Sequence, residues 1–150
     1  MFAAKDGMPQ MTLRTALIAT ILIVPTGLAA QRFIEKELVV IPVRPIDSHT
    51  FEAIENDGAG GTQMWCAAAK FTRKYLGQRG GNITVLTPRS PSVAVQGRKS
   101  VIFSTNAADT SRRSTSQGVR QAGQTFSMAH AYALCKSRYD LFVKVRVISP

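Results

Sequence analysis

The chain is poor in the residues on which metal and enzyme sites depend. Its 150 residues include two cysteines and two histidines, and their spacings are not the short ones that zinc sites use. The phosphate-binding motifs GxxxxGK(S/T) and GxGxxG are absent, and so is the GxSxG motif of serine hydrolases. The sequence therefore predicts no metal site, no cofactor and no catalytic residue.

Acidic residues are also scarce. Nine Asp and Glu residues stand against 19 Lys and Arg, which gives a formal net charge of +10. A basic chain of this kind favours anionic partners such as nucleic acid, a negatively charged cell surface or an acidic protein. Because the basic residues are scattered and no run of five occurs, a solvated surface charge is the competing interpretation.

No hydrophobic run is long enough to cross a membrane. The apolar run near the N-terminus, residues 16–24, is shorter than the roughly 20 residues that a membrane-spanning helix needs. Lys5 and Arg14 precede this run, whereas Gly27 and Ala29 follow it. A basic start, a short apolar run and small residues form the order of a secretory signal peptide.

We therefore expect residues 1–30 to be a signal peptide, with cleavage near Ala29 or Ala30, and residues 31–150 to form a single small domain. The expected location is the periplasm of a bacterium or the medium outside it. Loss of the first 30 residues removes two basic residues and one acidic residue, so the domain keeps a formal charge of +9.

The two cysteines, Cys66 and Cys135, fall within the expected mature domain. A single pair in an exported chain is interpreted first as one disulfide. Such a bond would close a loop of about 70 residues and stabilise the fold by roughly 4 kcal/mol. The sequence therefore predicts a small disulfide-stabilised domain.

An alternative interpretation makes Cys66 the nucleophile of a small cysteine hydrolase. Cys66 falls in the first turn of a predicted helix with Lys70 and Arg73 nearby, and both features lower the pKa of a thiol. The string QMWCAAA resembles papain-like enzymes, in which a cysteine opens a helix, although their glutamine lies further upstream. The base of such a site would be His49 or His130.

Apolar periodicity predicts two helices and up to six strands. The helices are expected at 63–76, with Thr62 as N-cap, and at 127–138, with Ser127 as N-cap. The strands are expected at 37–43, 51–55, 83–87, 92–95, 100–104 and 140–148. Residues 106–125 are polar and low in complexity, and we expect them to form a flexible loop.

This order predicts an α+β fold with a ββαββαβ-like series of elements. Two helices would pack on one face of a mostly antiparallel sheet of four to six strands. Pro42 cannot donate to a neighbouring strand, so the first strand is expected at an edge or to end there. In the last strand, Val143 and Val145 point one way and Lys144 and Arg146 the other, so one solvent-facing surface of the sheet would carry two cations.

Two groups of cations are candidates for binding an anionic polymer. Arg112, Arg113 and Arg120 fall in the expected loop, which could wrap a partner, while Lys144 and Arg146 would form a fixed pair on the sheet. No aromatic residue is interleaved with the loop arginines to stack on bases, which weakens the interpretation as a nucleic-acid binder.

The glycine-rich segment 58–61 precedes the first predicted helix. Backbone N–H groups at a helix N-terminus can hold an anion, so an anion site is one interpretation of this segment. A flexible connector is the simpler one.

Two strings carry a resemblance to a known group of proteins. WCAAAKFTRKYLG and GRKSVIFS, followed by a helix with a second cysteine, resemble small signal-peptide-bearing proteins of alphaproteobacteria that pair a WCxA-type helix with a later cysteine. The resemblance covers roughly residues 50–147. It implies export and a disulfide-tied fold, and it supplies no catalytic residue. We therefore expect a non-enzymatic binding or envelope-associated protein, with an anionic polymer or an envelope protein as its partner.

Overall fold

The computed structural model describes residues 38–106, 112–113, 115–136 and 142–149. They all belong to the second of the two units into which the chain divides, Phe33–Pro150. The expected signal peptide, residues 1–30, lies outside the described residues. No helix within the described ranges is long and apolar enough to cross a membrane.

The described residues form seven strands, two α-helices and one short 3-10 helix, which is an α+β arrangement. In chain order these are β1 (Leu38–Pro45), β2 (Thr50–Ile54), α1 (Gly61–Lys74), β3 (Asn82–Pro91), β4 (Lys99–Ser104), β5 (Arg112–Arg113), β6 (Gln124–Ser127), α2 (Met128–Ala133), η1 (Leu134–Lys136) and β7 (Phe142–Val147).

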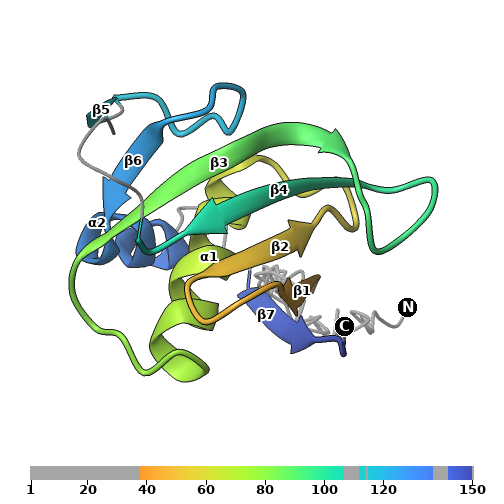
Figure 1. Cartoon of the computed structure of the whole chain (residues 1–150), viewed down its shortest axis with the longest axis horizontal. Helices are drawn as coiled ribbons and strands as arrows, with labels where there is room; N and C mark the ends of the chain where they lie inside the picture. The colour runs from red at the N-terminus through yellow and green to blue at the C-terminus, as the bar shows by residue number, and fades with distance from the viewer. Residues whose placement is uncertain (1–37, 107–111, 114, 137–141, 150) are drawn as a thin grey trace, which may run out of the picture. The chain divides into compact units, whose positions relative to one another are not determined.

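All these strands join one sheet in the order β5-β6-β3-β4-β2-β1-β7. The four inner pairings are antiparallel, whereas the two edge pairings, β5 with β6 and β1 with β7, are parallel. Both helices lie behind the sheet in Figure 1, and they contact each other. The α+β class is confirmed, but the sheet is mixed, and the two-residue strand β5 extends it beyond the six longer strands. A parallel pair needs a crossover, and the elements between β1 and β7 supply it.

β1 is not an edge strand, although Pro42 lies in its middle. It lies between β2 and β7, and its ladder with β2 begins only at Val43. The side chain of Asn56, which follows β2, donates to the carbonyl of Val40 at 3.1 Å, so that carbonyl points to the β2 side. The backbone groups of residues two apart in a strand point to the same side, so the nitrogen of Pro42 also points toward β2. β1 is not yet paired with β2 at Pro42, so its missing N–H costs the sheet no hydrogen bond.

α1 begins one residue before the predicted N-cap. Gly60 is the N-cap, and its N–H donates to Oε1 of Gln63 at 3.0 Å. This bond replaces the predicted capping by Thr62, which lies inside the helix. Satisfying one exposed N–H of the first turn in this way stabilises the helix start.

The first half of α1 is buried on every side. The six consecutive residues 64–69 are all buried, whereas a helix resting on a sheet would bury one stripe only. The sheet, α2 and segment 116–121 surround this half of the helix. The three alanines at 67–69 let these neighbours approach closely.

A chain of aromatic rings joins α1 to the sheet. The ring centroids are 4.5 Å apart for Trp65 and Phe126, 5.1 Å for Trp65 and Phe103, 5.9 Å for Phe103 and Phe51, and 4.6 Å for Phe51 and Phe71. All these rings are buried, and each such pair adds about 0.5–1.5 kcal/mol beyond the burial of its area. Trp65, next to the first cysteine, is therefore an anchor of the core.

The second helical region, predicted as one helix at 127–138, changes from an α-helix to a 3-10 helix along its length. α2 ends at Ala133 and is followed by the 3-10 helix η1, while residues 137 and 138 lie outside the described residues. Its start is as predicted, because Ser127 is the N-cap and its Oγ accepts from the N–H of His130 at 3.2 Å.

The predicted disulfide between Cys66 and Cys135 is present, and it joins the buried half of α1 to η1. The bonded residues are 69 apart in sequence, for which the loop-entropy model gives about 4 kcal/mol. Small domains are stable by only about 5–15 kcal/mol in total. The bond is therefore one of the largest single contributions to the stability of this fold.

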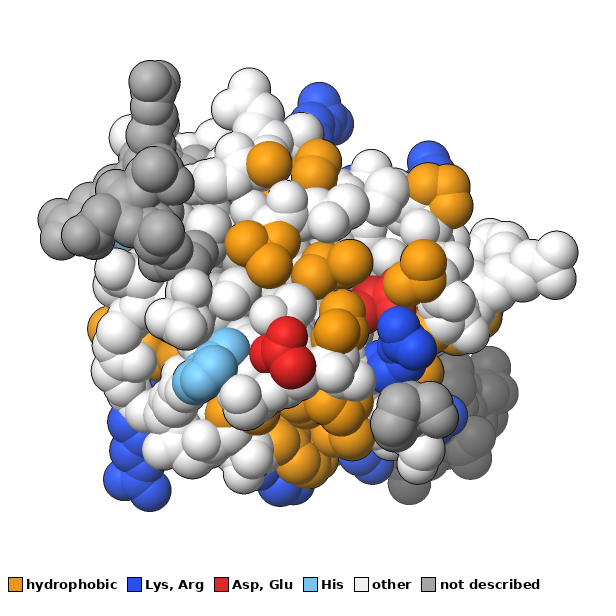
Figure 2. Space-filling view, viewed as in Figure 1, with side chains coloured by type: hydrophobic (Ala, Val, Ile, Leu, Met, Phe, Trp, Pro, Cys, Tyr) orange, Lys and Arg blue, Asp and Glu red, His pale blue; other side chains and the backbone are white. Residues whose placement is uncertain are grey.

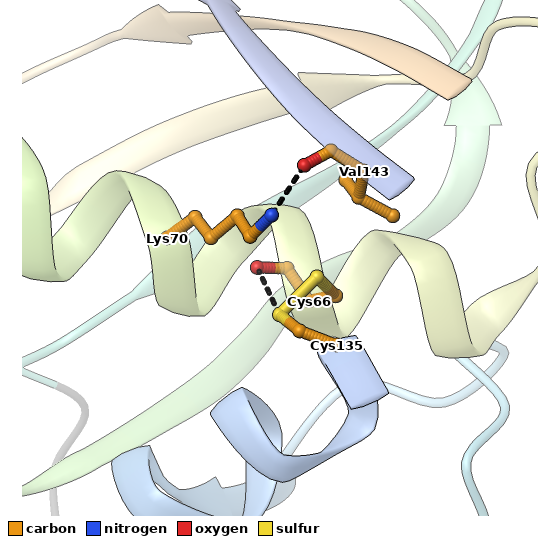
Figure 3. The surroundings of a disulfide bond; sticks show 4 residues. All are labelled: Cys66, Lys70, Cys135 and Val143. Carbon is orange, nitrogen blue, oxygen red and sulfur yellow. Dashed lines mark hydrogen bonds between the residues drawn. A yellow bond between two sulfur atoms is a disulfide. The ribbon is translucent and has the colours of Figure 1, made fainter. Parts of the chain in front are cut away.

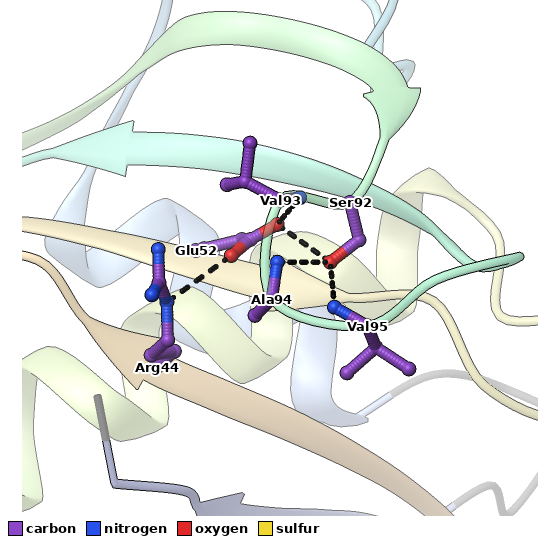
Figure 4. Close-up of polar contacts among 6 residues, drawn as sticks. All are labelled: Arg44, Glu52, Ser92, Val93, Ala94 and Val95. Atoms are coloured by element: carbon purple, nitrogen blue, oxygen red, sulfur yellow. Dashed lines mark hydrogen bonds and ion pairs between the residues drawn. The ribbon is translucent and has the colours of Figure 1, made fainter.

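Residues 92–98 form a loop where a strand was expected at 92–95. β3 instead runs to Pro91, and the N–H of Ser92 donates to the carbonyl of Arg98 at 2.8 Å to close the loop. The loop lies over β2 on the face of the sheet that points away from the helices (Figure 4).

Segment 106–125 is not one continuous loop, as was expected. It contains β5 and the start of β6, and residues 116–121 pack against α1. Nε1 of Trp65 donates to the carbonyl of Gly118 at 3.3 Å, and the buried Val119 accepts from a backbone N–H of β3 at 3.0 Å. Residues 107–111 and 114 lie outside the described residues. Backbone carbonyls of this segment make these hydrogen bonds. Any residue type supplies a backbone carbonyl, so the sequence pattern does not predict them.

The packing of this segment on α1 leaves no room for a side chain at Gly61. A methyl group at residue 61 would lie 2.2 Å from the carbonyl oxygen of Gln117. We expect Gly61→Ala to lower the free energy of unfolding by about 1–3 kcal/mol through overpacking, although Ala is the better helix former. Gly80→Ala is the matched control, because its methyl group would meet nothing within 4 Å. Urea unfolding measures both, and a Gly61→Ala variant as stable as the wild type would contradict this packing.

Candidate anion-binding site

A cleft of about 320 Å³ lies beside the C-terminal half of α1. Its walls come from the last turns of α1, the residues after it, α2 and β7. The lining residues are Lys70, Arg73, Lys74, Tyr75, Arg79, Tyr132 and Val145. We call it the basic cleft, because four of these seven residues are cations and none is acidic.

The spacing of the cations along α1 brings them together. Lys70, Arg73 and Lys74 are three and four residues apart, which places their side chains on one side of a helix. Gly77, at φ +70°, then reverses the chain beyond the helix, and Arg79 completes the group. A helical wheel alone would assign these cations to the solvated face of α1, so sequence reasoning missed the site.

Two tyrosines hold cations of the cleft through cation–π contacts. Cζ of Arg73 lies 4.0 Å from the ring centroid of Tyr132, and Nζ of Lys74 lies 5.3 Å from that of Tyr75. The Tyr75 ring is backed by Phe71, with the centroids 5.4 Å apart. Each cation–π contact is worth about 0.5–1 kcal/mol at an exposed site. It orients the cation without neutralising its charge.

Lys70 connects the cleft to the last strand. Its side chain is partly buried, and its Nζ donates to the carbonyl of Val143 in β7 (Figure 3). Burial lowers the pKa of Lys70 below its ordinary value, because a poorly solvated site disfavours the charged form. Cys66 precedes Lys70 by one helical turn, so the disulfide and this hydrogen bond hold η1 and β7 against the same side of α1.

The basic cleft has no acidic residue to balance its charge. The acidic residues among those described are Asp47, Glu52, Glu55 and Asp57, all in β2 or beside it. Two of them form ion pairs, with Arg44 at 3.4 Å and with Arg89 at 3.2 Å. None of the four lines the cleft, so its positive potential is not cancelled by the part of the chain that the structure describes.

The five cations predicted as anion-binding residues do not form one site. Arg112 and Arg113 lie in β5 at one edge of the sheet, whereas Lys144 and Arg146 lie in β7 at the opposite edge. Arg120 is exposed before β6. The alternation predicted for the last strand is confirmed between 143 and 146, because Val143 is buried and Val145 half-buried while Lys144 and Arg146 are exposed; Val147, expected on the inward side, is exposed.

The cysteine-hydrolase alternative is wrong for this structure. The sulfur of Cys66 is bonded to that of Cys135, and Cys66 is completely buried. A nucleophilic cysteine needs an accessible thiolate. His49 lies in the turn between β1 and β2 and His130 on α2, so neither is a partner for it.

The end of the glycine-rich segment 58–61 lines a second cleft of about 480 Å³, whose lining includes Arg89 and the predicted Arg120. Two of its backbone positions are already occupied by neighbouring groups. The N–H of Gly60 is used by Gln63, and the carbonyl of Gln117 covers Gly61. The hydroxyl of Thr62 donates to the side chain of Gln117 at 2.9 Å, and this hydrogen bond holds Gln117 beside the start of α1.

Glu52 is a buried carboxylate on the face of the sheet that points away from the helices (Figure 4). Its Oε1 accepts from Oγ of Ser92 at 2.7 Å and from the N–H of Val93 at 3.0 Å. Its Oε2 lies 3.4 Å from Nε of Arg44. These contacts attach the loop at 92–98 to the sheet.

The protonation of Glu52 is decided by opposing effects. Burial raises the pKa of Glu52, but a hydrogen bond from Ser100, the two bonds from the loop and the charge of Arg44 outweigh it. The pKa of Glu52 therefore lies below its ordinary value, because the charged form has more partners than the neutral form. Glu52 thus has a structural role as an ionised anchor.

Hydrophobic side chains are also exposed on that sheet face. Figure 2 shows them among polar and charged side chains, and Leu86 and Val93 are 43% and 74% exposed. The basic cleft is a separate feature, because it lies beside the helices.

Comparison with known proteins gives no family for this chain. No family model, no curated protein and no solved structure matches it. The geometry of the basic cleft is therefore the basis on which a function is assigned.

Glu52→Gln tests the buried anchor. At pH 7 we expect it to lower the free energy of unfolding by roughly 1–3 kcal/mol, because Arg44 loses its partner charge and the loop donors lose a charged acceptor. The wild-type contribution depends on pH. Because the folded pKa lies below the ordinary 4.5, the stabilisation is present above pH 4.5 and is lost as the pH falls through the folded pKa.

Urea unfolding of both proteins between pH 7 and pH 2 measures this difference. Glu55→Gln is the matched control, because its ion pair with Arg89 is more exposed and should be worth only about 0–1 kcal/mol. An unchanged gap between wild type and Glu52→Gln across the acidic range would contradict the ionised anchor.

Proposed function

We propose that this protein is an exported, disulfide-tied domain that binds an anionic partner in the basic cleft. One observation carries the proposal: Lys70, Arg73, Lys74 and Arg79 line one concave site that no described acidic residue lines. A concave site with charges of one sign raises the local concentration of ions of the opposite sign. An anionic polymer or an acidic protein of the cell envelope has the charge that this site attracts.

Export is supported by two features that are independent of the cleft. The first 30 residues have the order of a signal peptide. A disulfide between the chain's two cysteines is typical of oxidising compartments and rare in the cytosol. The periplasm or the medium is the location that fits both, and it agrees with the resemblance to exported alphaproteobacterial proteins.

Binding is favoured over hydrolysis by the state of the side chains. The disulfide removes Cys66 as a nucleophile, whereas two cations of the cleft are held in place by tyrosine rings. Cations held in this way keep their charge available for an incoming anion. The polymer is recognised by its charge and local shape, without a chemical step.

Export predicts a processed and oxidised protein. When the full chain is expressed in a bacterium, we expect a periplasmic or secreted form that starts at or near Ala30 and carries a linked Cys66–Cys135 peptide. N-terminal sequencing and non-reducing peptide mass spectrometry measure the two properties. A chain without residues 1–30 is the control, and it should stay in the cytoplasm with reduced thiols. Full-length protein confined to the cytoplasm would refute export.

Removing cations from the cleft should weaken polymer binding. We expect Lys74→Gln combined with Arg79→Gln to lower the affinity for labelled heparin about tenfold at low salt, because fewer counterions are released on binding. The slope of log affinity against log salt should become shallower by about one for each cation removed from the cleft. Fluorescence anisotropy over a salt series measures both quantities.

The control removes the same charge elsewhere. Arg98→Gln combined with Lys99→Gln changes two exposed cations, just before and at the start of β4, that do not line the cleft. We expect the affinity of this variant to fall much less than that of the cleft variant. An equal fall in the affinity of both variants would show that the overall charge of the protein, and not the cleft, binds the polymer. A wild-type protein that binds neither heparin nor DNA at low salt would overturn the proposal.

A further inference from the structure

We propose that the basic cleft is a receptor for a single phosphomonoester group, and that Arg73, stacked on Tyr132, binds its oxygen atoms. This inference rests on the proposed function, because it names the anion that the cleft takes. The contact that carries it is the one between Cζ of Arg73 and the ring of Tyr132, 4.0 Å from the centroid.

The position of Arg73 over the ring leaves its donors available. A guanidinium stacked on a ring uses its flat face, while its N–H groups point outward along the edge. Within the described residues the ion pairs belong to Arg44 and Arg89, and no hydrogen bond uses the guanidinium of Arg73. Its planar fork can therefore donate two parallel hydrogen bonds to two oxygens of one phosphate, which a lysine cannot do.

Arg73 is also held in place before any ligand arrives. Its backbone belongs to α1, and Tyr132 belongs to α2, which is followed directly by η1 with Cys135. The disulfide to Cys66 ties η1 to α1, so a covalent bond holds together the two helical elements that carry the ring and the guanidinium. A side chain that is already ordered loses less conformational entropy on binding, and this raises affinity.

The surrounding charge favours a doubly charged group. Lys70, Lys74 and Arg79 stand around Arg73 in the same cleft, and no described carboxylate lines it. A phosphomonoester carries about −1.5 to −2 at pH 7, whereas a carboxylate or a phosphodiester carries one charge. The dianion therefore gains more from four cations. The volume of about 320 Å³ is at the small end of ligand sites, which suits a phosphorylated sugar or a lipid headgroup.

Isothermal titration with small probes tests the choice of anion. At pH 7.5 and low salt, we expect glucose 1-phosphate to bind at least about tenfold more tightly than glucuronate, which carries one charge on a similar ring. Glucose should not bind. At pH 5 the phosphomonoester is mostly a monoanion, because its second pKa is about 6, so its affinity should fall toward that of glucuronate. Equal binding of both anions at pH 7.5 would overturn the inference.

Variants of the stacked pair test the role of Arg73. Arg73→Lys keeps the charge but removes the fork, and we expect it to weaken glucose 1-phosphate binding about tenfold or more. Tyr132→Leu should also weaken it, while Tyr132→Phe should restore most of the affinity, because the ring alone supplies the contact. Lys99→Gln is the charge control outside the cleft. If Tyr132→Leu does not fold, Arg73→Lys alone decides, and wild-type affinity in Arg73→Lys refutes the inference.

Vesicles distinguish a soluble ligand from a lipid. Phosphatidic acid presents a phosphomonoester, whereas phosphatidylglycerol presents a phosphodiester, and each is mixed with phosphatidylcholine to equal total charge. Preferential binding to phosphatidic acid that Arg73→Lys abolishes supports the same group on a lipid, even if glucose 1-phosphate binds weakly. Heparin binding without any preference for phosphomonoesters would refute this inference and leave the proposed function standing. A wild-type protein that binds none of these anions would refute both.

Discussion

The bond between Cys66 and Cys135 decides where the second helical region lies, and with it the shape of the basic cleft. Cys66 belongs to the half of α1 that the core surrounds, so its side of the bond cannot move without disturbing the aromatic core. Cys135 follows Tyr132 by three residues, so the bond brings that ring beside α1. One covalent link therefore connects the stability of the fold to the geometry of its candidate site.

Charge is divided between two sides of the molecule. The described acidic residues all lie in or beside β2, where Glu52 and Glu55 pair with Arg44 and Arg89. On the helical side, tyrosine rings hold the cations in place of carboxylates. A carboxylate would occupy the donors of a cation, whereas a ring leaves those donors able to bind an incoming anion. This difference separates a structural ion pair from a candidate binding site.

The local pattern predicted those elements whose environment repeats regularly. The helix at α1 and the alternation in β7 were predicted from apolar spacing, because apolar residues recur at the helical repeat in the first and at every second residue in the other. The prediction that Pro42 places β1 at an edge was wrong, because a missing N–H costs a hydrogen bond only where the neighbouring strand has a carbonyl to pair with it. Segment 116–121 was missed because its carbonyls, rather than its side chains, make the contacts with Trp65 and β3.

The sequence by itself determined the excess of positive charge and the α+β class. It also determined the pairing of the cysteines, because each of the two has only the other as a possible partner within the chain. It also placed Lys70, Arg73 and Lys74 on one side of a helix, because that follows from the helical repeat. Only the tertiary structure decided that Tyr132 and Val145 stand beside them. Those residues are about 60 to 75 positions further along the chain, and their approach depends on strand order and packing, which no local periodicity contains.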